Sequence, residues 1–391
     1  MRWMVVLLAA MIAALCCWRV WGLLTDSCPP EACDSGETVP LSVPLPVDFA
    51  RWTISHHRPI ELPKGAPDSP DIVKRFARDD IWVFSASLGG LKAARWDGKR
   101  WLKTTPPLPE DLQIEDVTGT GSDDIWISGW STRLGTPDDQ TSPDGTLVHW
   151  NGDRWERIPV AASAINLAAV ARNDVWALFD GEITHWDGRT WTPASTPEVP
   201  MPDSLDGEDP GMLLTDITAL AADDVWAVGT VATYLCCDQR IFHRDVVMHW
   251  DGHVWNLVDL GIRGLDLRQA IPDGHGGVWI ATWHDGEPWA PIMIHYRDGR
   301  WSKSMLPRPS NSQRVQATEI KLTGTGKVLV TGIAYTDTDL PTTVEYSLSG
   351  EPAQVPTASE RRVSQSVSLM PRRRVKSATG AQMIGSPTVR P

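Results

Sequence analysis

A two-part tryptophan motif recurs along the chain and constrains the fold more than any other feature. In its first part, an aliphatic residue precedes a tryptophan, and an aspartate or a glycine precedes both. Successive tryptophans of this part lie 44, 50, 50 and 53 residues apart, and they are Trp82, Trp126, Trp176, Trp226 and Trp279. A period of this size predicts a repeat architecture, in which each unit buries its faces against its neighbours.

The second part is a Trp-Asp-Gly or Trp-Asn-Gly sequence with another tryptophan three residues after the glycine. The aromatic pairs are Trp96 and Trp101, Trp150 and Trp155, Trp186 and Trp191, Trp250 and Trp255, and, in slightly altered form, Tyr296 and Trp301. A degenerate sixth copy follows at 327–329 and 346–350, with Leu329 in place of the first tryptophan. The chain therefore carries six units.

Asp-Gly or Asn-Gly between two extended runs is a strong hairpin signal, because both central residues of a type I′ turn have positive φ. A two-residue turn at Asp97-Gly98 would set Trp96 opposite Lys99 and Ala94 opposite Trp101. The two tryptophans are then predicted to be diagonal neighbours on one face of the hairpin.

An apolar stretch precedes each first part, so each unit is expected to contain four strands: a before the aspartate, b at the first tryptophan, c up to the Asp-Gly, and d after it. Six such units predict an all-β fold, a single β-propeller of six four-stranded blades over residues 46–356, with seven blades as the alternative. The segment 46–55, which contains Trp52, is expected to supply strand d of the last blade and so close the ring.

The repeat accounts for most of the 21 tryptophans, which outnumber the 4 tyrosines and 5 phenylalanines together. Fifteen belong to the blade pattern and three to the first 24 residues, which leaves Trp130, Trp283 and Trp289. The hydrophobic fraction of 42% and the charged fraction of 22% exclude wholesale disorder and a polytopic membrane protein.

The segments 224–229, Asp-Val-Trp-Ala-Val-Gly, and 249–255, His-Trp-Asp-Gly-His-Val-Trp, resemble the Trp-rich propeller repeats of uncharacterised secreted bacterial proteins. The resemblance covers about residues 48–352. The Asp-Gly-x-x-Trp turn is also similar to the Asp-box of sialidases, although one residue separates Asp from Gly there. Kelch and galactose-oxidase repeats share the architecture without their Gly-Gly signature. This family resemblance implies a fold and no reaction.

Residues 1–24 resemble an export signal, with Arg2 followed by an apolar run over 3–17. Cleavage after Gly22 is the preferred interpretation, with an uncleaved membrane anchor or a lipid-modified Cys16 as alternatives. A Pro- and Cys-containing linker follows at 25–45. In each case the rest of the protein is expected outside the cytoplasm. It would contact a membrane only through an uncleaved leader.

Four cysteines remain beyond the leader: Cys28, Cys33, Cys236 and Cys237. In an oxidising compartment they are candidate disulfide partners, with three pairings that the sequence does not separate. Their spacing does not favour zinc.

Charge is unevenly distributed in a chain whose net charge is −13, because seven basic residues and one acidic residue lie from Thr357 onward. The acidic body argues against nucleic acid as a partner, and a solubilising role for the charge is preferred. The tail 357–391 is expected to be disordered.

Alternating strands would place the a–b and c–d turns on one face of the ring, the short-turn face, and the b–c and d–a connections on the other, the long-loop face. Function on repeat scaffolds usually lies in irregular loops, and aromatic rings beside Arg suit sugar stacking or a protein partner. The ligand-binding candidates are Trp130, Arg133, Tyr234, Arg240, Phe242, His243, Trp283, His284 and Trp289. The alternative is that these residues only cap long loops.

Two repeated polar positions are interpreted as structural. One is the residue before each second-part Trp, Arg95, His149, His185 or His249, expected to pack against a neighbouring sheet rather than bind metal. The other is the aspartate that opens strand b, Asp80, Asp124, Asp174 or Asp224, expected to accept backbone N–H bonds. Recurrence in several blades argues against a catalytic ring.

The first functional hypothesis is an extracytoplasmic binding module, expected to be a monomer, that recognises a glycan or an envelope or extracellular protein. The second is a propeller-type glycoside hydrolase, which requires a carboxylate pair. The third is a quinone-dependent oxidoreductase, suggested only by the adjacent Cys236-Cys237. No cofactor is predicted; Ca²⁺ at the acidic loop of Asp203, Asp206, Glu208 and Asp209 is a weaker interpretation than solvated acids.

Overall fold

The computed structural model describes fifteen parts of the chain: 51–55, 62–67, 70, 72–87, 90–108, 112–131, 145–160, 164–203, 209–234, 240–260, 264–282, 291–310, 312–322, 327–335 and 342–349. The elements assigned in these ranges are β-strands. Within them, no helix is long and apolar enough to cross a membrane.

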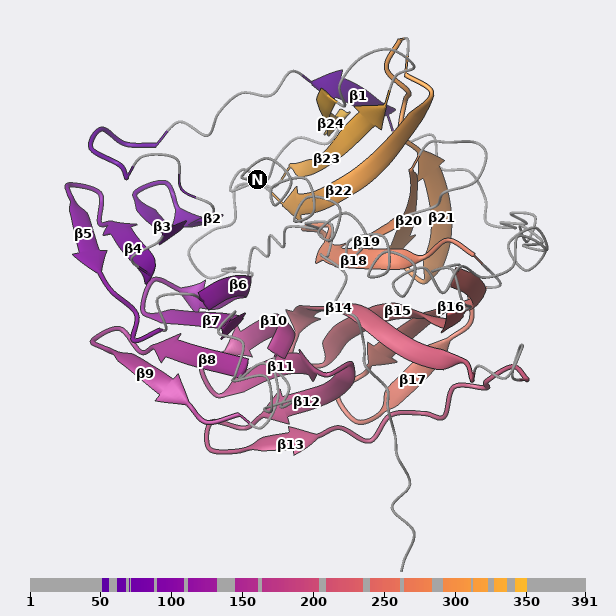
Figure 1. The fold of residues 1–391 in the computed structure, drawn as a ribbon, viewed down its shortest axis with the longest axis horizontal. Coiled ribbons are helices and arrows are strands. Elements are labelled where there is room, and N and C mark those ends of the chain that lie inside the picture. The colour runs from indigo at the N-terminus through magenta and orange to yellow at the C-terminus, as the bar shows by residue number, and fades with distance from the viewer. Residues whose placement is uncertain are drawn as a thin grey trace, which may run out of the picture.

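Six four-stranded antiparallel sheets surround a common centre (Figure 1). Strand a of each sheet lies innermost and strand d outermost, and consecutive strands pair in every sheet. The arrangement confirms the predicted all-β propeller with six blades, so the seven-bladed alternative was wrong.

The blades follow the order of the repeats. Blade 1 consists of β2 (Ile72–Ala77), β3 (Asp80–Ser87), β4 (Gly90–Trp96) and β5 (Trp101–Thr104). Blade 2 consists of β6 (Leu112–Gly121), β7 (Asp124–Ser131), β8 (Gly145–Trp150) and β9 (Trp155–Ile158). Blade 3 consists of β10 (Ala164–Ala171), β11 (Asp174–Phe179), β12 (Glu182–Trp186) and β13 (Trp191–Pro193).

The second half of the ring has the same construction. Blade 4 consists of β14 (Gly211–Ala221), β15 (Asp224–Tyr234), β16 (Arg240–Trp250) and β17 (Trp255–Val258). Blade 5 consists of β18 (Leu267–Pro272), β19 (Val278–Thr282), β20 (Ile292–Arg297) and β21 (Arg300–Met305). Blade 6 consists of β22 (Arg314–Leu322), β23 (Val328–Tyr335), β24 (Thr342–Ser349) and β1 (Arg51–Ser55).

The two ends of the propeller meet in blade 6, where β1 pairs with β24 in antiparallel register (Figure 1). Trp52 lies opposite Leu348 and is buried, and its Nε1 donates a hydrogen bond of 2.8 Å to Ser304 Oγ of blade 5. The predicted closing strand is therefore confirmed over Arg51–Ser55.

Rows of tryptophan fill the space between neighbouring blades, as the repeat predicts. The first-part Trp of one blade meets the aromatic pair of the next, and such contacts are worth about 0.5–1.5 kcal/mol beyond the area they bury. The ring-centroid distances are Trp82 to Trp150 5.8 Å and to Trp155 6.0 Å, Trp126 to Trp186 5.9 Å and to Trp191 6.3 Å, Trp176 to Trp250 5.2 Å and to Trp255 5.3 Å, Trp226 to Tyr296 5.0 Å and to Trp301 5.7 Å, and Trp279 to Trp52 5.3 Å.

The predicted two-residue turn at Asp97-Gly98 was wrong. Trp96 lies directly opposite Trp101, and the connection spans four residues, 97–100. The Asp97 carboxylate causes the difference, because its Oδ1 accepts the backbone N–H of Lys99 at 2.9 Å and of Arg100 at 2.8 Å. An aspartate that bonds the backbone two residues on forms an Asx turn, which replaces the type I′ turn here. Asn151, Asp187 and Asp251 bond in the same way.

The glycine of each such connection lies against the a–b turn of its own blade. Gly188 has φ +92°, and a Cβ there would lie 2.7 Å from Asn173 Cβ. The corresponding contacts are Gly98 with Asp79, Gly152 with Asp123 and Gly252 with Asp223. The c–d and a–b turns therefore share one face, as predicted.

Gly188→Ala is expected to lower the free energy of unfolding by about 1–3 kcal/mol, because alanine is strained at positive φ and its methyl group meets Asn173. Gly211→Ala is the matched control, since Gly211 begins β14 without a positive φ and a Cβ there meets nothing within 4 Å. Urea unfolding checks both variants. Equal losses would contradict this account of the turn.

Candidate functional site

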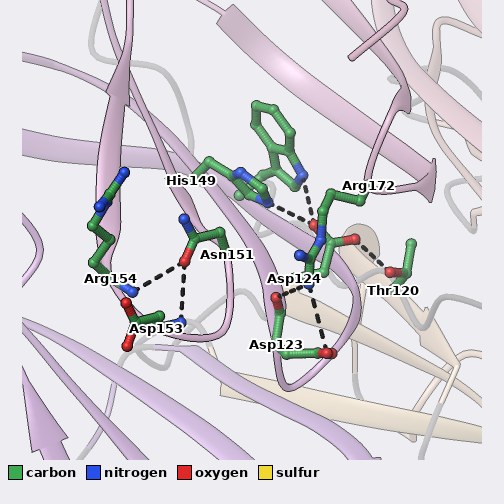
Figure 2. A network of polar contacts seen from close by, with 9 residues as sticks. Thr120, Asp123, Asp124, His149, Asn151, Asp153, Arg154 and Arg172 are labelled. Atoms are coloured by element: carbon green, nitrogen blue, oxygen red, sulfur yellow. Dashed lines mark hydrogen bonds and ion pairs between the residues drawn. The ribbon is translucent and has the colours of Figure 1, made fainter.

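Each of the first five blades carries a polar pair at its short-turn face, as blade 2 shows (Figure 2). There Asp124 Oδ1 lies 2.7 Å from His149 Nε2, and Asp124 also accepts a short bond from Thr120. The equivalent distances are Asp80–Arg95 3.2 Å, Asp174–His185 2.8 Å, Asp224–His249 2.9 Å and Asp273–His295 2.9 Å. Because the same polar pair recurs in five blades, we interpret it as a structural element of the repeat.

The imidazoles also stack on the first-part tryptophans of their own blades. The ring centroids are 4.1 Å apart for His149 and Trp126 and 3.9 Å apart for His295 and Trp279. The predicted structural role of the histidines agrees with this, although the ring they stack on belongs to their own sheet. The four aspartates that were expected to accept backbone N–H groups, Asp80, Asp124, Asp174 and Asp224, accept hydrogen bonds from side chains here.

Hydrogen bonds keep two of these carboxyls ionised. Burial opposes ionisation of Asp273, but bonds from His295, from the backbone N–H groups of His275 and Gly277, and from Arg297 outweigh it and lower its pKa. The same balance, with His149 and Thr120 as donors, lowers the pKa of Asp124.

The predicted ligand-binding residues belong to the long-loop face, and the structure describes the strand positions of five of the nine. Trp130 is next to last in β7, opposite Gly145 of β8. Tyr234 ends β15 opposite Arg240, which begins β16. Phe242 lies opposite Ala232, and the register shift beside that pair leaves His243 unpaired as a bulge. Bulges are frequent beside functional sites.

Blade 4 departs from the repeat at this face. In blade 3 the β11–β12 hairpin ends at Phe179 opposite Glu182, with a turn of Asp180 at φ 49° and Gly181 at φ 85°. The position equivalent to Phe179 in blade 4 is Gly229, and the β15–β16 pairing continues five residues further, to Tyr234. At about 3.3 Å per residue the hairpin extends roughly 16 Å beyond that of blade 3, and roughly 10 Å beyond those of blades 1 and 6, where the b–c pairing reaches Ser87 and Ala334.

The remaining candidates lie outside the described residues. They are Arg133, Trp283, His284, Trp289, Cys28, Cys33, Cys236 and Cys237. The same is true of Asp206 and Glu208 in the acidic loop. Among the described residues, no group of three or more His, Cys, Asp or Glu side chains is placed to hold a metal ion.

A second feature, which the sequence reasoning missed, is a polar belt around the centre of the ring. It contains one residue of the innermost strand of each blade: Lys74, Asp116, Asn166, Asp216, Gln269 and Glu319. Lys74, Asp116, Asn166, Asp216 and Gln269 are each at most 4% exposed. Polar groups this deeply buried require partners.

Most belt residues bond the innermost strand of the following blade. Asp116 Oδ2 accepts Leu167 N–H at 2.8 Å, Asp216 Oδ2 accepts Ala270 N–H at 2.7 Å, and Gln269 Oε1 accepts Ile320 N–H at 2.9 Å. Asn166 Nδ2 donates to Asp216 Oδ1 at 2.8 Å. An innermost strand has an open edge, so these bonds satisfy backbone donors that the sheets leave unpaired.

Backbone bulges position these side chains. In blades 2 to 6 the a–b register shifts by one residue immediately before the belt residue, as between Ile114 and Asp116 or between Leu214 and Asp216. An extra residue bends a strand and redirects its side chains. The bulge thus turns the belt residue towards the next blade.

Blade 1 breaks the pattern, because its belt residue is a lysine directly opposite Trp82. Lys74 is 2% exposed, and burial lowers its pKa, against the attraction of Asp116, Glu319 and Asp216. Burial in turn raises the pKa of Asp116 to about 6, partly offset by Lys74. It raises the pKa of Asp216 well above its ordinary value, with Asp116 adding to the effect. Lys74 therefore links blade 1 electrostatically to the belt.

The belt can in principle hold and release a proton near neutral pH. Burial raises the pKa of Asp116 to about 6, a value within the range of general acids. Its Oδ2, however, is bound to the backbone of blade 3, and Asp216 bonds three N–H groups, on Asn166, Ile217 and Ala270. These bonds favour a structural role in joining blades.

Titration of Asp116 should be visible in stability. Its pKa of about 6 in the folded state exceeds the ordinary value, so its contribution to stability is full below about pH 4 and is lost as the pH rises to about 6. Between these pH values the wild-type protein is expected to lose about 2 kcal/mol of unfolding free energy relative to Asp116→Asn. Urea unfolding at both pH values measures the difference.

Titrating groups outside the belt do not disturb that comparison, whereas the coupling of Asp116 to Asp216 and Lys74 is part of the measured difference. Burial also raises the pKa of Asp245 to about 6, but Asp245 is present in both proteins and cancels. Asp124 and Asp273, with lowered pKa, lose their contributions only at more acidic pH. A difference between wild type and variant that is constant across the range would contradict the burial of an ionisable Asp116.

The belt does have a sequence signal. In blades 2 to 6 its residue stands ten positions before the first-part Trp or its substitute Leu329, as Asp116 does before Trp126. The signal mixes Asp, Asn, Gln and Glu, and blade 1 places Lys74 eight positions before Trp82. It is therefore visible only after the blades have been aligned on their tryptophans.

No protein-family model matches the chain, and no curated protein matches it in sequence. Similar solved structures include a protein of unknown function from Dyadobacter fermentans, with 13% identity, 70% of this chain and 92% of that chain covered, and a TM-score of 0.41. An ulvan lyase solved with a bound saccharide has 10% identity, 67% and 79% coverage, and a TM-score of 0.40. YCF48 bound to a D1 peptide has 15% identity, 78% and 98% coverage, and a TM-score of 0.33.

These proteins are propellers that differ widely in what they bind, one a glycan and another a peptide. The chain itself is a Trp-rich six-bladed β-propeller that resembles bacterial propeller proteins of unknown function. Likeness at this level concerns the fold and assigns no activity or ligand.

Proposed function

We propose that the protein is a binding module outside the cytoplasm that recognises a glycan or a protein through its long-loop face. The observation that carries the proposal is the lengthened β15–β16 hairpin of blade 4, which ends at the pair Tyr234 and Arg240. In a ring of similar blades no single blade is distinguished from the others. A specific site is therefore expected at a blade that departs from the repeat.

The chemistry of the strand ends supports the same face. Tyr234, Arg240 and Phe242 lie within a few residues of one another along the paired strands. Aromatic rings stack on sugars and anchor protein partners, and Arg adds directed hydrogen bonds. The short-turn face, in contrast, uses its polar groups within the fold, as Asp124 and His149 illustrate.

A location outside the cytoplasm is proposed from the sequence of residues 1–24, whose apolar run follows Arg2. The four cysteines beyond it suit an oxidising compartment. Mass spectrometry of the protein recovered from its natural host would test cleavage after Gly22 and any disulfide among these cysteines.

The binding proposal is tested with the purified full chain on a glycan array and against envelope extracts. Tyr234→Ala with Arg240→Ala is expected to weaken the binding of a captured ligand at least tenfold. The matched control is Arg154→Ala on the short-turn face, where the side chain is exposed and bonds Glu156. An equal loss of ligand binding in the control would reject this face. Unchanged binding in Tyr234→Ala with Arg240→Ala, in Trp130→Ala and in Trp283→Ala with Trp289→Ala would reject it too.

A glycoside hydrolase is the second candidate, favoured by the carboxyls of Asp116 and Asp216 in the belt. The pKa of Asp116, raised to about 6, is suited to a general acid. Glycoside hydrolases use two carboxyls, and Asp216, whose pKa is also raised, would be the second. Release of reducing sugar from a bound glycan, abolished in Asp116→Asn while that variant still binds the glycan, would establish this function. The quinone-dependent alternative depends on Cys236 and Cys237, outside the described residues.

A further inference from the structure

The joint between blades 6 and 1 differs from the other five. In each of those, the first-part tryptophan of one blade meets at least one aromatic ring of the outer strands of the next. Blade 6 has Leu329 at the tryptophan position, and no aromatic contact joins it to Trp96 and Trp101 within the described residues. The aromatic pair of blade 1 thus lacks the usual partner.

The face of blade 6 that should pack against blade 1 is only partly buried. Along β23, the residues on the blade 5 side, among them Val328 and Val330, are buried within the core shared by blades 5 and 6. The alternate residues Leu329, Thr331 and Ile333 remain partly exposed. In β19 of blade 5, by comparison, all five residues are buried. Blade 1 therefore does not seal blade 6 as other blades seal their neighbours.

A short segment of the chain covers the aromatic pair of blade 1 instead. We call residues 62–67, Leu-Pro-Lys-Gly-Ala-Pro, the strap; it lies in the connection from β1 to β2. Leu62 packs against the same buried cluster of blade 1 as Trp96 and Trp101 do, which consists of Ile81, Val83 and Ala94. Trp101 Nε1 donates a hydrogen bond of 3.3 Å to Pro63 O, and a Cβ on Gly65 would lie 3.8 Å from Trp101 Cδ1.

The strap has a local structure suited to this contact. Ala66 N–H bonds Pro63 O at 3.2 Å, and Gly65 has φ +84°, so the segment turns over the indole. Its two prolines fix φ and so reduce the conformational entropy that the segment loses on ordering, and the indole N–H of Trp101 gives the turn a directed hydrogen bond.

We propose that the strap is an intramolecular ligand of blade 1, which occupies the place of the missing tryptophan and covers the face of blade 1 at the open joint of the ring. The groove formed by Trp96 and Trp101 is accordingly a peptide-binding surface whose occupant is residues 62–67 of the same chain. Release of the strap exposes this groove at the open joint between blades 6 and 1.

The first test removes one bond. Trp101→Phe loses the donor to Pro63 O, whereas Trp191→Phe at the equivalent position of blade 3 loses none, because Trp191 Nε1 has no partner. Protection of the Ala66 amide against hydrogen exchange is expected to fall about fivefold in Trp101→Phe and to stay unchanged in Trp191→Phe. Equal protection in the two variants would overturn the proposal.

The second test replaces the whole strap in the full chain by a Gly-Ser segment of the same length. Amides of β3 and β4 are expected to lose protection about tenfold while those of β11 keep it. A synthetic peptide of residues 60–69, added in excess, should restore protection and should fail to do so when Trp101→Leu is also present. Unchanged protection of β3 and β4 after strap replacement, or no effect of the peptide, would contradict the proposal.

Discussion

Replacing Trp126 by alanine is expected to lower the free energy of unfolding by about 3–5 kcal/mol. The side chain is fully buried, stacks on His149 at 4.1 Å, and meets Trp186 and Trp191 of the next blade. Truncation removes the apolar contact between two blades and leaves a cavity that rigid sheets on both sides cannot fill. The hydrogen bond from Trp126 Nε1 to Asp124 is lost as well.

Denaturant unfolding followed by far-UV circular dichroism measures this loss. Leu102→Ala, on the outer strand of blade 1, is the control, because its side chain is 37% exposed and the expected change is within about 0.5 kcal/mol. A loss below about 1 kcal/mol for Trp126→Ala would show that the tryptophan rows do not hold the blades together.

Asp216→Leu is expected to destabilise the protein by about 3–5 kcal/mol, because it removes the acceptor of three buried donors. These are the backbone N–H groups of Ile217 and Ala270 and the side-chain amide of Asn166. Leucine has a similar size, so the loss reports the unsatisfied donors more than a cavity. Thermal and urea unfolding, compared at one pH, give its magnitude.

Asp216→Asn separates the hydrogen bonds from the charge. The asparagine carbonyl still accepts the N–H of Ala270. Its side chain carries no charge, so the variant avoids the cost of burying a charged carboxylate, which raises the pKa of Asp216. We expect it to lose clearly less than Asp216→Leu, about 1–2 kcal/mol. Comparable losses in both variants would mean that the belt depends on the charge of Asp216, against the hydrogen-bond account.

The overall fold was predictable because its signal is repeated. A tryptophan that must pack between two sheets recurs once per blade, as Trp82 and Trp126 do, and the same spacing defines the number of blades. The closing strand was predictable from Trp52, which supplies the aromatic ring that blade 6 needs opposite Trp279.

The turn geometry was not predictable from the Asp-Gly pair alone. In blade 5, Asp298 and Gly299 form the expected two-residue turn, with φ of 51° and 74° and Arg297 opposite Arg300. In blade 1, Asp97 stands one position earlier in a connection of equal length and forms an Asx turn. The position of the carboxylate relative to the strand end therefore decides between the two.

The candidate site was predictable only as a face. Alternation of strands puts the irregular connections on one side, and the lengthened hairpin that ends at Tyr234 agrees with this. The belt was missed because its residues differ in type from blade to blade and depend on bulges, such as that before Asp116, which leave no fixed local motif. The strap was missed because proline and glycine between strands ordinarily indicate a plain linker.

A disulfide engineered between the first and last strands of the propeller, β1 and β24, tests the central claim, a six-bladed ring closed by strand β1, most directly. Thr53 lies opposite Ser347, and their Oγ atoms are 3.3 Å apart although 294 residues separate them. Thr53→Cys with Ser347→Cys is therefore expected to form a crosslink, identified by mass spectrometry of the linked peptides, without loss of stability. The control Thr53→Cys with Thr343→Cys, out of register, should not crosslink. No crosslink in the first pair, or equal crosslinking in both, would contradict the closed ring.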